Sequence, residues 1–391
     1  MRIAVIIGTR PEAIKTAPVI QELRNRASMF DVVVIATAQH REMLDQALSI
    51  FNIKPDYDLD LMNPGQSLSS LSGRVMKHMD STLASLRPDM IMVQGDTTTV
   101  FVSALAAFYR KIPVIHVEAG LRSHDFNNPF PEEANRRLTS VLAEIHCAPT
   151  VLAKTELIHE GIAPEKIILC GNTVVDALEL MLDRPFSFSG TLFENILSDG
   201  RRIVLVTCHR RECLGKDLEQ IFLSLIDLVN CFPDVHIVYP VHLNPEVRGT
   251  AKKVLSGVDR IHLVPPLDYL TFVNLMKRSH LILTDSGGMQ EEAPTLRKPL
   301  LVMRRVTERP EAFQDGFAKV IGTERSAIVR EASRILQNED DDVTARYNGN
   351  PYGDGKASAR IADALERWSQ GIRPLLEPGR EFNYQVGNQR V

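Results

Sequence analysis

Short apolar runs recur along the chain and alternate with longer stretches of helical periodicity. In the first half these runs are "IAVIIG", "VVVIAT", "MIMVQG", "PVIHV", "EIHCA" and "KIILCG", and in the second half they are "RIVLVT", "HIVYPV", "IHLV", "LILTD", "PLLVM" and "FAKVIG". Runs of this kind without strict alternation are typical of strands buried on both faces, and their alternation with helices indicates parallel sheets. Because 391 residues exceed what one core usually serves, the pattern predicts two doubly wound α/β domains.

The segment from Glu179 to Arg202 separates the two sets of runs and is the expected crossing between the domains. It is not of low complexity, so a hinge beside helical segments is expected rather than a flexible linker. From about Arg373 the chain loses its periodicity, and we expect this tail, 373–391, to be extended or disordered. In open parallel sheets ligands bind beyond the carboxyl ends of the strands, so chemistry is expected there.

Composition and charge argue against several classes of protein. The net charge is −4 and no basic block is present, which argues against nucleic acid as the main partner. No apolar run reaches the roughly 20 residues of a membrane helix, and a strand-like "RIAVIIG" without a cleavable signal opens the chain, which indicates a cytoplasmic protein. The five cysteines stand singly, without metal-finger spacing or the density of a disulfide scaffold, so we expect them to be reduced and packed.

The first apolar run leads into "GTRPEAIK", which places Arg10 and Lys15 just beyond a strand. Pro11 and Glu12 occupy positions where a dinucleotide-binding motif has glycines, so a nicotinamide cofactor is not expected. Arg10 and Lys15 are candidates for binding an anion. The alternative is that both are solvated surface charges.

Acidic residues follow the next strands of the first half. Asp96 comes directly after "MIMVQG" in a threonine-rich turn, where it is either a functional carboxylate or a helix cap. His116 and Glu118 stand two apart in "VIHVEAG", which predicts that they share one face of a strand. Burying charged groups inside such an apolar run costs free energy, so these residues are expected to serve either catalysis or a buried structural pair.

Charged residues also open a helix and end a strand further along. Glu132 and Arg136 are spaced i and i+4 in a helix expected to begin after Pro131, where a surface salt bridge is the alternative to a functional pair. His209 and Arg210 follow "IVLVT", and a histidine followed by arginines at a strand end suits a diphosphate. Packing or solvation would explain either residue alone.

In "ILTDSGGMQEEAP" a strand runs into two glycines and then into a helical segment. Glycines let a backbone approach a ligand closely, and the free N–H groups at a helix start attract anions. The stretch therefore predicts a phosphate site, with an ordinary turn capped by Ser286 as the alternative.

Together these segments resemble one family, the non-hydrolysing UDP-N-acetylglucosamine 2-epimerases, which interconvert UDP-GlcNAc and UDP-ManNAc. The matching segments run in the family's order from Gly8 to Ala312: "GTRPEAIK", "TAQHREMLDQ", "QGDTTT", "HVEAGLRS", "PEEANRRLTS", "GNTVVDA", "CHRRE", "PVHLNP", "DSGGMQEEAP" and "TERPEA". The series covers essentially the whole chain except the tail, so it is far more specific than any single glycine motif.

The resemblance implies a glycosyltransferase-B-like architecture, with two Rossmann-like doubly wound domains facing a cleft that holds the nucleotide sugar. The N-terminal domain is expected at 1–175 and the UDP-binding domain at 176–357. A C-terminal helix at about 358–372 is expected to rejoin the first domain. The resemblance further implies a homodimer.

The resemblance also assigns residues to the nucleotide. Ser286, Gly287 and Gly288 are expected to hold the diphosphate, together with Arg10, Lys15 and His209. Glu292 is expected to accept hydrogen bonds from the ribose hydroxyls, and Phe272 to lie beside the uracil. Adjacent helix positions differ by about 100°, so Glu291 is expected to point elsewhere.

The chemistry of the family accounts for the carboxylates. The hydrogen on C2 of the sugar is not flanked by a carbonyl, so elimination of UDP to 2-acetamidoglucal and its re-addition replace simple deprotonation. The resemblance implies a catalytic group of Asp96, Glu118, Glu132 and His209, with Arg136 positioning Glu132 or the substrate. No metal or redox cofactor is required by this route.

Some members of the family are regulated by UDP-GlcNAc in a second pocket. The residues in matching segments are Gln39, Glu42, Gln66 and His242, but Gly65 stands where some relatives carry an arginine. Alternative functions are a hydrolysing 2-epimerase that releases ManNAc and UDP, a 2-epimerase of a related UDP-2-acetamido uronic acid, and a non-catalytic sensor of nucleotide sugars.

Overall fold

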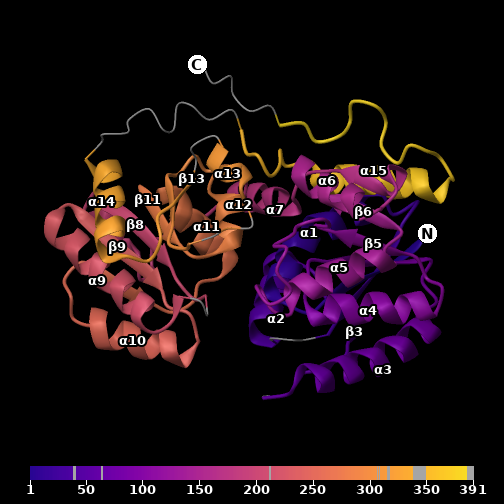
Figure 1. Cartoon of the computed structure of the whole chain (residues 1–391), viewed down its shortest axis with the longest axis horizontal. Helices are drawn as coiled ribbons and strands as arrows, with labels where there is room; N and C mark the ends of the chain where they lie inside the picture. Colours follow the sequence, from indigo (N-terminus) through magenta and orange to yellow (C-terminus); the bar gives the residue numbers. More distant parts are fainter. Residues whose placement is uncertain are drawn as a thin grey trace. The chain divides into compact units, whose positions relative to one another are not determined.

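The computed structural model describes residues 1–37, 41–62, 65–210, 213–305, 307, 309–314, 318–337 and 349–384, except for the side chains of 41, 42 and 314. These residues form two compact units, each a sheet covered by helices (Figure 1). Unit 1 contains Met1–Leu180 and Tyr352–Asn383, and unit 2 contains Met181–Pro351. The boundary lies inside a helix, at the start of the predicted crossing segment.

Unit 1 is built on a parallel seven-stranded sheet with the order β3-β2-β1-β4-β5-β6-β7. The strands are β1 (Arg2–Ile7), β2 (Asp31–Ala36), β3 (Tyr57–Asp58), β4 (Met90–Gln94), β5 (Val114–Val117), β6 (Ile145–Ala148) and β7 (Ile167–Leu169). The helical elements are α1 (Arg10–Asn25), α2 (Arg41–Ile50), α3 (Leu68–Leu86), α4 (Thr98–Tyr109), α5 (Glu132–Leu142), α6 (Val151–His159), η1 (Pro164–Lys166), α7 (Thr173–Leu182) and α15 (Ala357–Ser369). Side chains of β1 and β4 form a core with α3 and α4.

Unit 2 is built on a parallel six-stranded sheet with the order β10-β9-β8-β11-β12-β13. The strands are β8 (Arg202–Thr207), β9 (Val235–Pro240), β10 (Ile261–Val264), β11 (Leu281–Thr284), β12 (Leu300–Val302) and β13 (Ala318–Val320). The helices are α8 (Glu194–Ser198), α9 (Lys216–Cys231), α10 (Pro245–Leu255), α11 (Tyr269–Arg278), α12 (Gly287–Glu292), α13 (Glu311–Gln314) and α14 (Arg325–Leu336). The main core of this unit lies between the sheet and α9, α10 and α14.

Every apolar run that predicted a strand forms one, so the prediction of two doubly wound parallel sheets is confirmed. In the described residues the structure adds β3, whose two exposed residues carry no apolar signal. The strand order reverses between β1 and β4 in unit 1, and between β8 and β11 in unit 2. Ligands of such sheets bind at these switch points, beyond the carboxyl ends of the strands.

The C-terminal helix α15 belongs to unit 1, where it packs against α1 and its Asp363 pairs with Arg26 at 2.7 Å. The following tail is described as far as Tyr384. Phe382 is buried and its N–H donates to the Leu169 carbonyl at 2.9 Å. Of the two alternatives expected for the tail, disorder does not hold for residues 373–384, which form neither helix nor strand, and 385–391 lie outside the described residues. No described helix is long and apolar enough to cross a membrane.

Candidate active site

A buried ion pair lies just beyond β5 in unit 1. Lys15 Nζ is 2.8 and 2.7 Å from the two carboxylate oxygens of Glu118, and the Gln94 amide also donates to Glu118. Both charged side chains are buried, and each offsets the cost of burying the other. The structure thus gives Lys15 a carboxylate partner in unit 1, while its predicted contact with UDP stays a prediction.

Glu118 and His116 do not share a strand face as we predicted. β5 ends at Val117, and Glu118 has a φ of 63°, which takes it out of the alternation of the strand. His116 Nε2 lies 2.7 Å from the Gly95 carbonyl oxygen, and burial lowers the pKa of its imidazole to about 3. His116 is therefore a neutral, buried side chain at neutral pH.

A second buried carboxylate, Glu12, joins the turns that follow β1 and β4. Its oxygens accept from the Gly8 N–H at 2.6 Å and from the hydroxyls of Thr9 and Thr97, each at 3.0 Å. Thr9 caps α1 and Thr97 caps α4, so one carboxylate connects two helix starts at the switch point. Arg10 is the first residue of α1 and is half-buried there.

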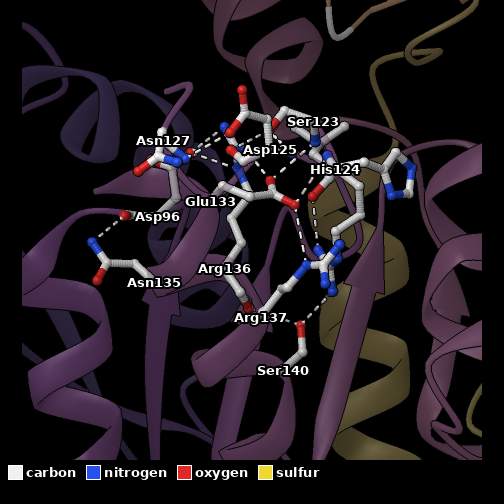
Figure 2. A network of polar contacts seen from close by, with 12 residues as sticks. Asp96, Ser123, His124, Asp125, Asn127, Glu133, Asn135, Arg136, Arg137 and Ser140 are labelled. Carbon is white, nitrogen blue, oxygen red and sulfur yellow. Dashed lines mark hydrogen bonds and ion pairs between the residues drawn. The ribbon is translucent and has the colours of Figure 1, made fainter. Parts of the chain in front are cut away.

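Asp96 lies in the turn after β4 and is held by α5 (Figure 2). Its Oδ2 accepts from Arg136 Nε at 2.9 Å and Nη2 at 2.8 Å, and its backbone oxygen accepts from Asn135 at 2.9 Å. Arg136 also donates to Glu133 at 2.9 Å. The structure thus assigns Arg136 to Asp96 and Glu133, while Glu132 is the first residue of α5, as predicted.

In unit 2 a buried aspartate ties the ends of β8 and β11 together. Asp285 Oδ2 accepts from the backbone N–H groups of His209 and Arg210 at 2.6 and 2.7 Å, and its Oδ1 lies 3.2 Å from His209 Nδ1. Burial alone would raise the pKa of Asp285, but these donors outweigh it and the pKa lies below its ordinary value. His209 is thus fixed at the switch point of the second sheet.

The two glycines that precede the helical segment differ in their surroundings. A Cβ on Gly287 would come within 2.6 Å of the Arg309 guanidinium, which is 2.6 Å from Glu291. A Cβ on Gly288 would have 3.9 Å to its nearest neighbours, Ser286 and Glu292. A Cβ on Gly287 would thus displace the Arg309 guanidinium, whereas one on Gly288 would make ordinary van der Waals contacts.

The predicted ribose residue and its sequence neighbour point to different partners. Glu292 is buried and accepts from the Tyr269 hydroxyl at 2.7 Å, whereas Glu291 pairs with Arg309. The expectation that Glu291 points elsewhere is confirmed. Phe272 lies in α11, the same helix as Tyr269, and is partly buried.

The regulatory candidates are only partly described. Gln39 and the side chain of Glu42 lie outside the described residues. Gln66 donates to the sulfur of Met62 in unit 1, and the His242 ring stacks on His209 in unit 2 with a centroid distance of 5.2 Å. A regulatory role for these residues stays a prediction.

Four residues with evident roles at these edges were missed as site residues: Gln94, Tyr269, Glu12 and Asp285. The spacing of Thr9 and Glu12 is that of a capping box, which is a sequence signal for a local role of Glu12. Asp285 stands directly before the glycines, but nothing in the sequence shows that it accepts from a distant strand. In the described part of the chain no group of His, Cys, Asp and Glu is arranged to hold a metal ion.

Comparison with known proteins places this chain in a family. The family model described as UDP-N-acetylglucosamine 2-epimerase matches residues 21–366. The UDP-N-acetylglucosamine 2-epimerase of Escherichia coli K12 is 47% identical over 371 residues, which cover 94% of this chain and 98% of that protein.

Solved structures agree with this match. The UDP-GlcNAc 2-epimerase from Neisseria meningitidis, bound to UDP-GlcNAc, has a TM-score of 0.88 at 45% identity and covers 94% of this chain and 100% of its own. S. aureus MnaA with UDP has a TM-score of 0.89 at 44% identity, covering 98% and 100%. The predicted Rossmann-like, glycosyltransferase-B-like fold class is thus confirmed, and the chain is an enzyme of the UDP-N-acetylglucosamine 2-epimerase family.

Proposed function

We propose that this chain interconverts UDP-GlcNAc and UDP-ManNAc by eliminating UDP to 2-acetamidoglucal and adding it back. The observation that carries the proposal is the set of acidic residues at one edge of the unit 1 sheet. Asp96 follows β4, Glu118 follows β5, and Glu132 opens α5. The names of the relatives and the UDP-GlcNAc bound to the Neisseria protein support the same substrate.

The reaction explains why the site needs carboxylates on one side and cations on the other. The C1–O bond breaks with its electron pair leaving on UDP, C2 loses its proton, and a C1–C2 double bond forms. The transition state is cationic at C1 and anionic on the diphosphate, so carboxylates have to face the sugar and donors have to face UDP. In the reverse addition the proton returns to the other face of C2.

We assign the candidate residues to the two halves of this charge separation. Asp96, Glu118 and Glu132 serve as acid, base and stabilisers of the cationic sugar, because inversion at C2 needs proton handling on both faces. The UDP half is held by Arg10, Lys15, His209, Ser286, Gly287, Gly288, Glu292 and Phe272. Support for the diphosphate assignment comes from the absence of any clash at a Cβ placed on Gly288, whose nearest neighbours would lie 3.9 Å away, and from the fixed backbone of His209.

Incubation of the full chain with UDP-GlcNAc in D2O, followed by NMR of the products, tests the proposal. We expect deuterium at C2 of the UDP-ManNAc formed, and small amounts of 2-acetamidoglucal and UDP during long incubations. Protium retained at C2 with no glycal at any time would reject the elimination route. Free ManNAc as the product would instead indicate a hydrolysing enzyme, and a panel that includes UDP-2-acetamido uronic acids tests the third alternative.

We also infer that the enzyme acts as a homodimer. Large apolar side chains on the neighbouring helices α4 and α5 are exposed, namely Phe108, Tyr109, Leu138 and Val141. Large apolar side chains exposed on neighbouring helices are unfavourable in water and are typical of an interface. Light scattering of the wild type should give the mass of two chains, and Tyr109→Glu with Val141→Glu should give one. A monomeric wild type would contradict the inference.

A further inference from the structure

One buried carboxylate lies at the centre of the polar network in Figure 2. Glu133 is fully buried, and each of its oxygens accepts from two donors. Oε2 accepts from the Ser123 N–H at 3.0 Å and from Arg136 Nη1 at 2.9 Å. Oε1 accepts from the His124 N–H at 3.3 Å and from Arg137 Nε at 3.2 Å. Glu133 thus joins the segment that follows β5 to two consecutive arginines of α5.

These contacts connect Glu133 to two of the candidate catalytic carboxylates. Arg136, which Glu133 holds on one side, donates to Asp96 through its other nitrogens at 2.9 and 2.8 Å. Glu132 is the residue before Glu133 in the first turn of α5. Any shift of the Glu133 side chain would therefore move the Asp96 partner and the start of α5 relative to Ser123 and His124.

The surroundings of Glu133 require a carboxylate rather than an amide. All the groups that face its oxygens are donors, two from the backbone and two from guanidinium groups. A glutamine would present an NH2 group to two of these donors in either orientation of its amide, because only one of its two end atoms can accept. Glu133→Gln thus breaks the anchor with almost no change in side-chain volume.

We propose that Glu133 is a positioning residue, which holds Asp96 in place through Arg136 and holds Glu132 in place through the start of α5. This inference rests on the proposed function, because the epimerisation defines what Asp96 and Glu132 have to reach. Misplacement of reacting groups by about 1 Å can lower a rate by about 10² without loss of substrate binding.

Glu160 provides a matched control within the same cluster of charges. Its carboxylate pairs with Arg122 at 2.6 Å and with Arg137 at 3.6 Å, and its side chain is 28% exposed. These pairs include neither Arg136 nor the amides of the segment after β5. Glu160→Gln therefore removes ion pairs of similar kind without touching the proposed link to Asp96.

The test measures kcat and KM for UDP-GlcNAc in wild type, Glu133→Gln and Glu160→Gln, with melting temperatures for all three. We expect kcat to fall about 10-fold to 100-fold in Glu133→Gln with KM nearly unchanged, and to stay near the wild-type value in Glu160→Gln. Glu133→Asp should recover part of the loss, since it keeps both acceptor oxygens. Equal kcat in the two glutamine variants at temperatures where both are folded would overturn the proposal.

Two further measurements cover the remaining cases. If Glu133→Gln does not fold, Arg136→Lys tests the same link. The lysine ammonium lacks the forked guanidinium that reaches Asp96 and Glu133 together. Unchanged kcat in Arg136→Lys would overturn the proposal. If the wild type forms no UDP-ManNAc, the proposed function fails separately. Amide hydrogen exchange at Ser123 and His124, the two amides that Glu133 accepts from, then decides the role of Glu133. It should be faster in Glu133→Gln, or in Arg136→Lys, than in Glu160→Gln, and equal exchange would reject the anchor.

Discussion

Glu12 in unit 1 and Asp285 in unit 2 are buried carboxylates at equivalent places, the switch points of the two sheets, yet their pKa values shift in opposite directions. Burial raises the pKa of Glu12 to about 7, from an ordinary value of 4.5. The pKa of Asp285 lies below its ordinary value in spite of its burial. Burial alone therefore does not decide whether a carboxylate at such an edge is charged.

The donors explain the difference. Asp285 accepts from two backbone N–H groups on one oxygen and has the His209 ring beside the other, so its charged form is strongly favoured. Glu12 accepts from the Gly8 N–H and from the hydroxyls of Thr9 and Thr97, and the Thr9 backbone N–H also favours its charged form, but the cost of burial outweighs these donors. A hydroxyl can rotate to accept from a neutral partner, which N–H groups cannot do.

The largest effect is expected from Asp285→Ala. It leaves the His209 and Arg210 N–H groups without their acceptor, and each unpaired buried donor costs about 1–3 kcal/mol, so we expect a loss of about 4 kcal/mol in unfolding free energy. Urea denaturation at neutral pH measures it. The difference in unfolding free energy between wild type and variant should shrink as the pH falls below 3.8, the ordinary pKa of an aspartate. Protonation removes the charge of Asp285 in this range, and with it the stability that the charged form contributes. A loss below about 1 kcal/mol would show that water replaces the carboxylate.

Glu12→Gln should behave in the opposite way. A folded pKa raised from 4.5 to about 7 means that wild-type stability falls as the pH rises through this range, by up to about 3 kcal/mol at about 1.4 kcal/mol per unit. Gln fits, because its oxygen accepts from Gly8 and its NH2 group donates to the threonine hydroxyls. Melting temperatures from about pH 5 to about pH 8 should therefore decline in wild type relative to the variant. Parallel curves would place the pKa of Glu12 near its ordinary value.

Glu118→Gln and Glu292→Gln extend the comparison from structural carboxylates to two carboxylates that we propose to contact the substrate. Loss of a proton-transfer group should lower the turnover of Glu118→Gln by roughly 10² or more. Glu292→Gln should raise KM more than it lowers kcat, because a ribose contact is similar in ground and transition states. Glu118→Gln removes the charge that pairs with Lys15, so its melting temperature must show that this variant is folded in the assay. Near-normal turnover of Glu118→Gln would make its pair with Lys15 purely structural.

The smallest effect on stability is expected from Gly288→Ala, with Gly287→Ala as its matched partner. Gly288→Ala should change the unfolding free energy by about 1 kcal/mol or less, since the added methyl meets nothing closer than 3.9 Å. Its affinity for UDP, measured by calorimetry, should nevertheless fall if the diphosphate lies there. Gly287→Ala should cost more stability, because its methyl meets Arg309 at 2.6 Å. Unchanged UDP affinity in Gly288→Ala would remove Gly288 from the proposed site.

Local signals made much of the fold predictable. Buried parallel strands are nearly continuous runs of Val, Ile and Leu, so every predicted strand appears in the structure. Only β3 among the described strands was not predicted, because its Tyr57 and Asp58 are exposed. The helix start at Glu132 follows from a local rule, because proline is common near the start of a helix. Glu291 and Glu292 point to different partners because adjacent helix positions differ by about 100°. Of the two alternatives for the tail, disorder does not hold for residues 373–384, because the Phe382 N–H donates to the carbonyl of Leu169, far away in the sequence.

By itself, then, the sequence determined two parallel sheets, the strand ends where polar residues gather, and a resemblance specific enough to name a family. Only the tertiary structure decided which of those polar residues meet. Glu118 pairs with Lys15 and not with His116, and Arg136 serves Asp96 and Glu133. The physical reason is that hydrogen bonds at a sheet edge join residues that are adjacent in space but far apart in the chain. Lys15 and Glu118, for example, are 103 positions apart. Spacing along the sequence reports only the neighbours within one element.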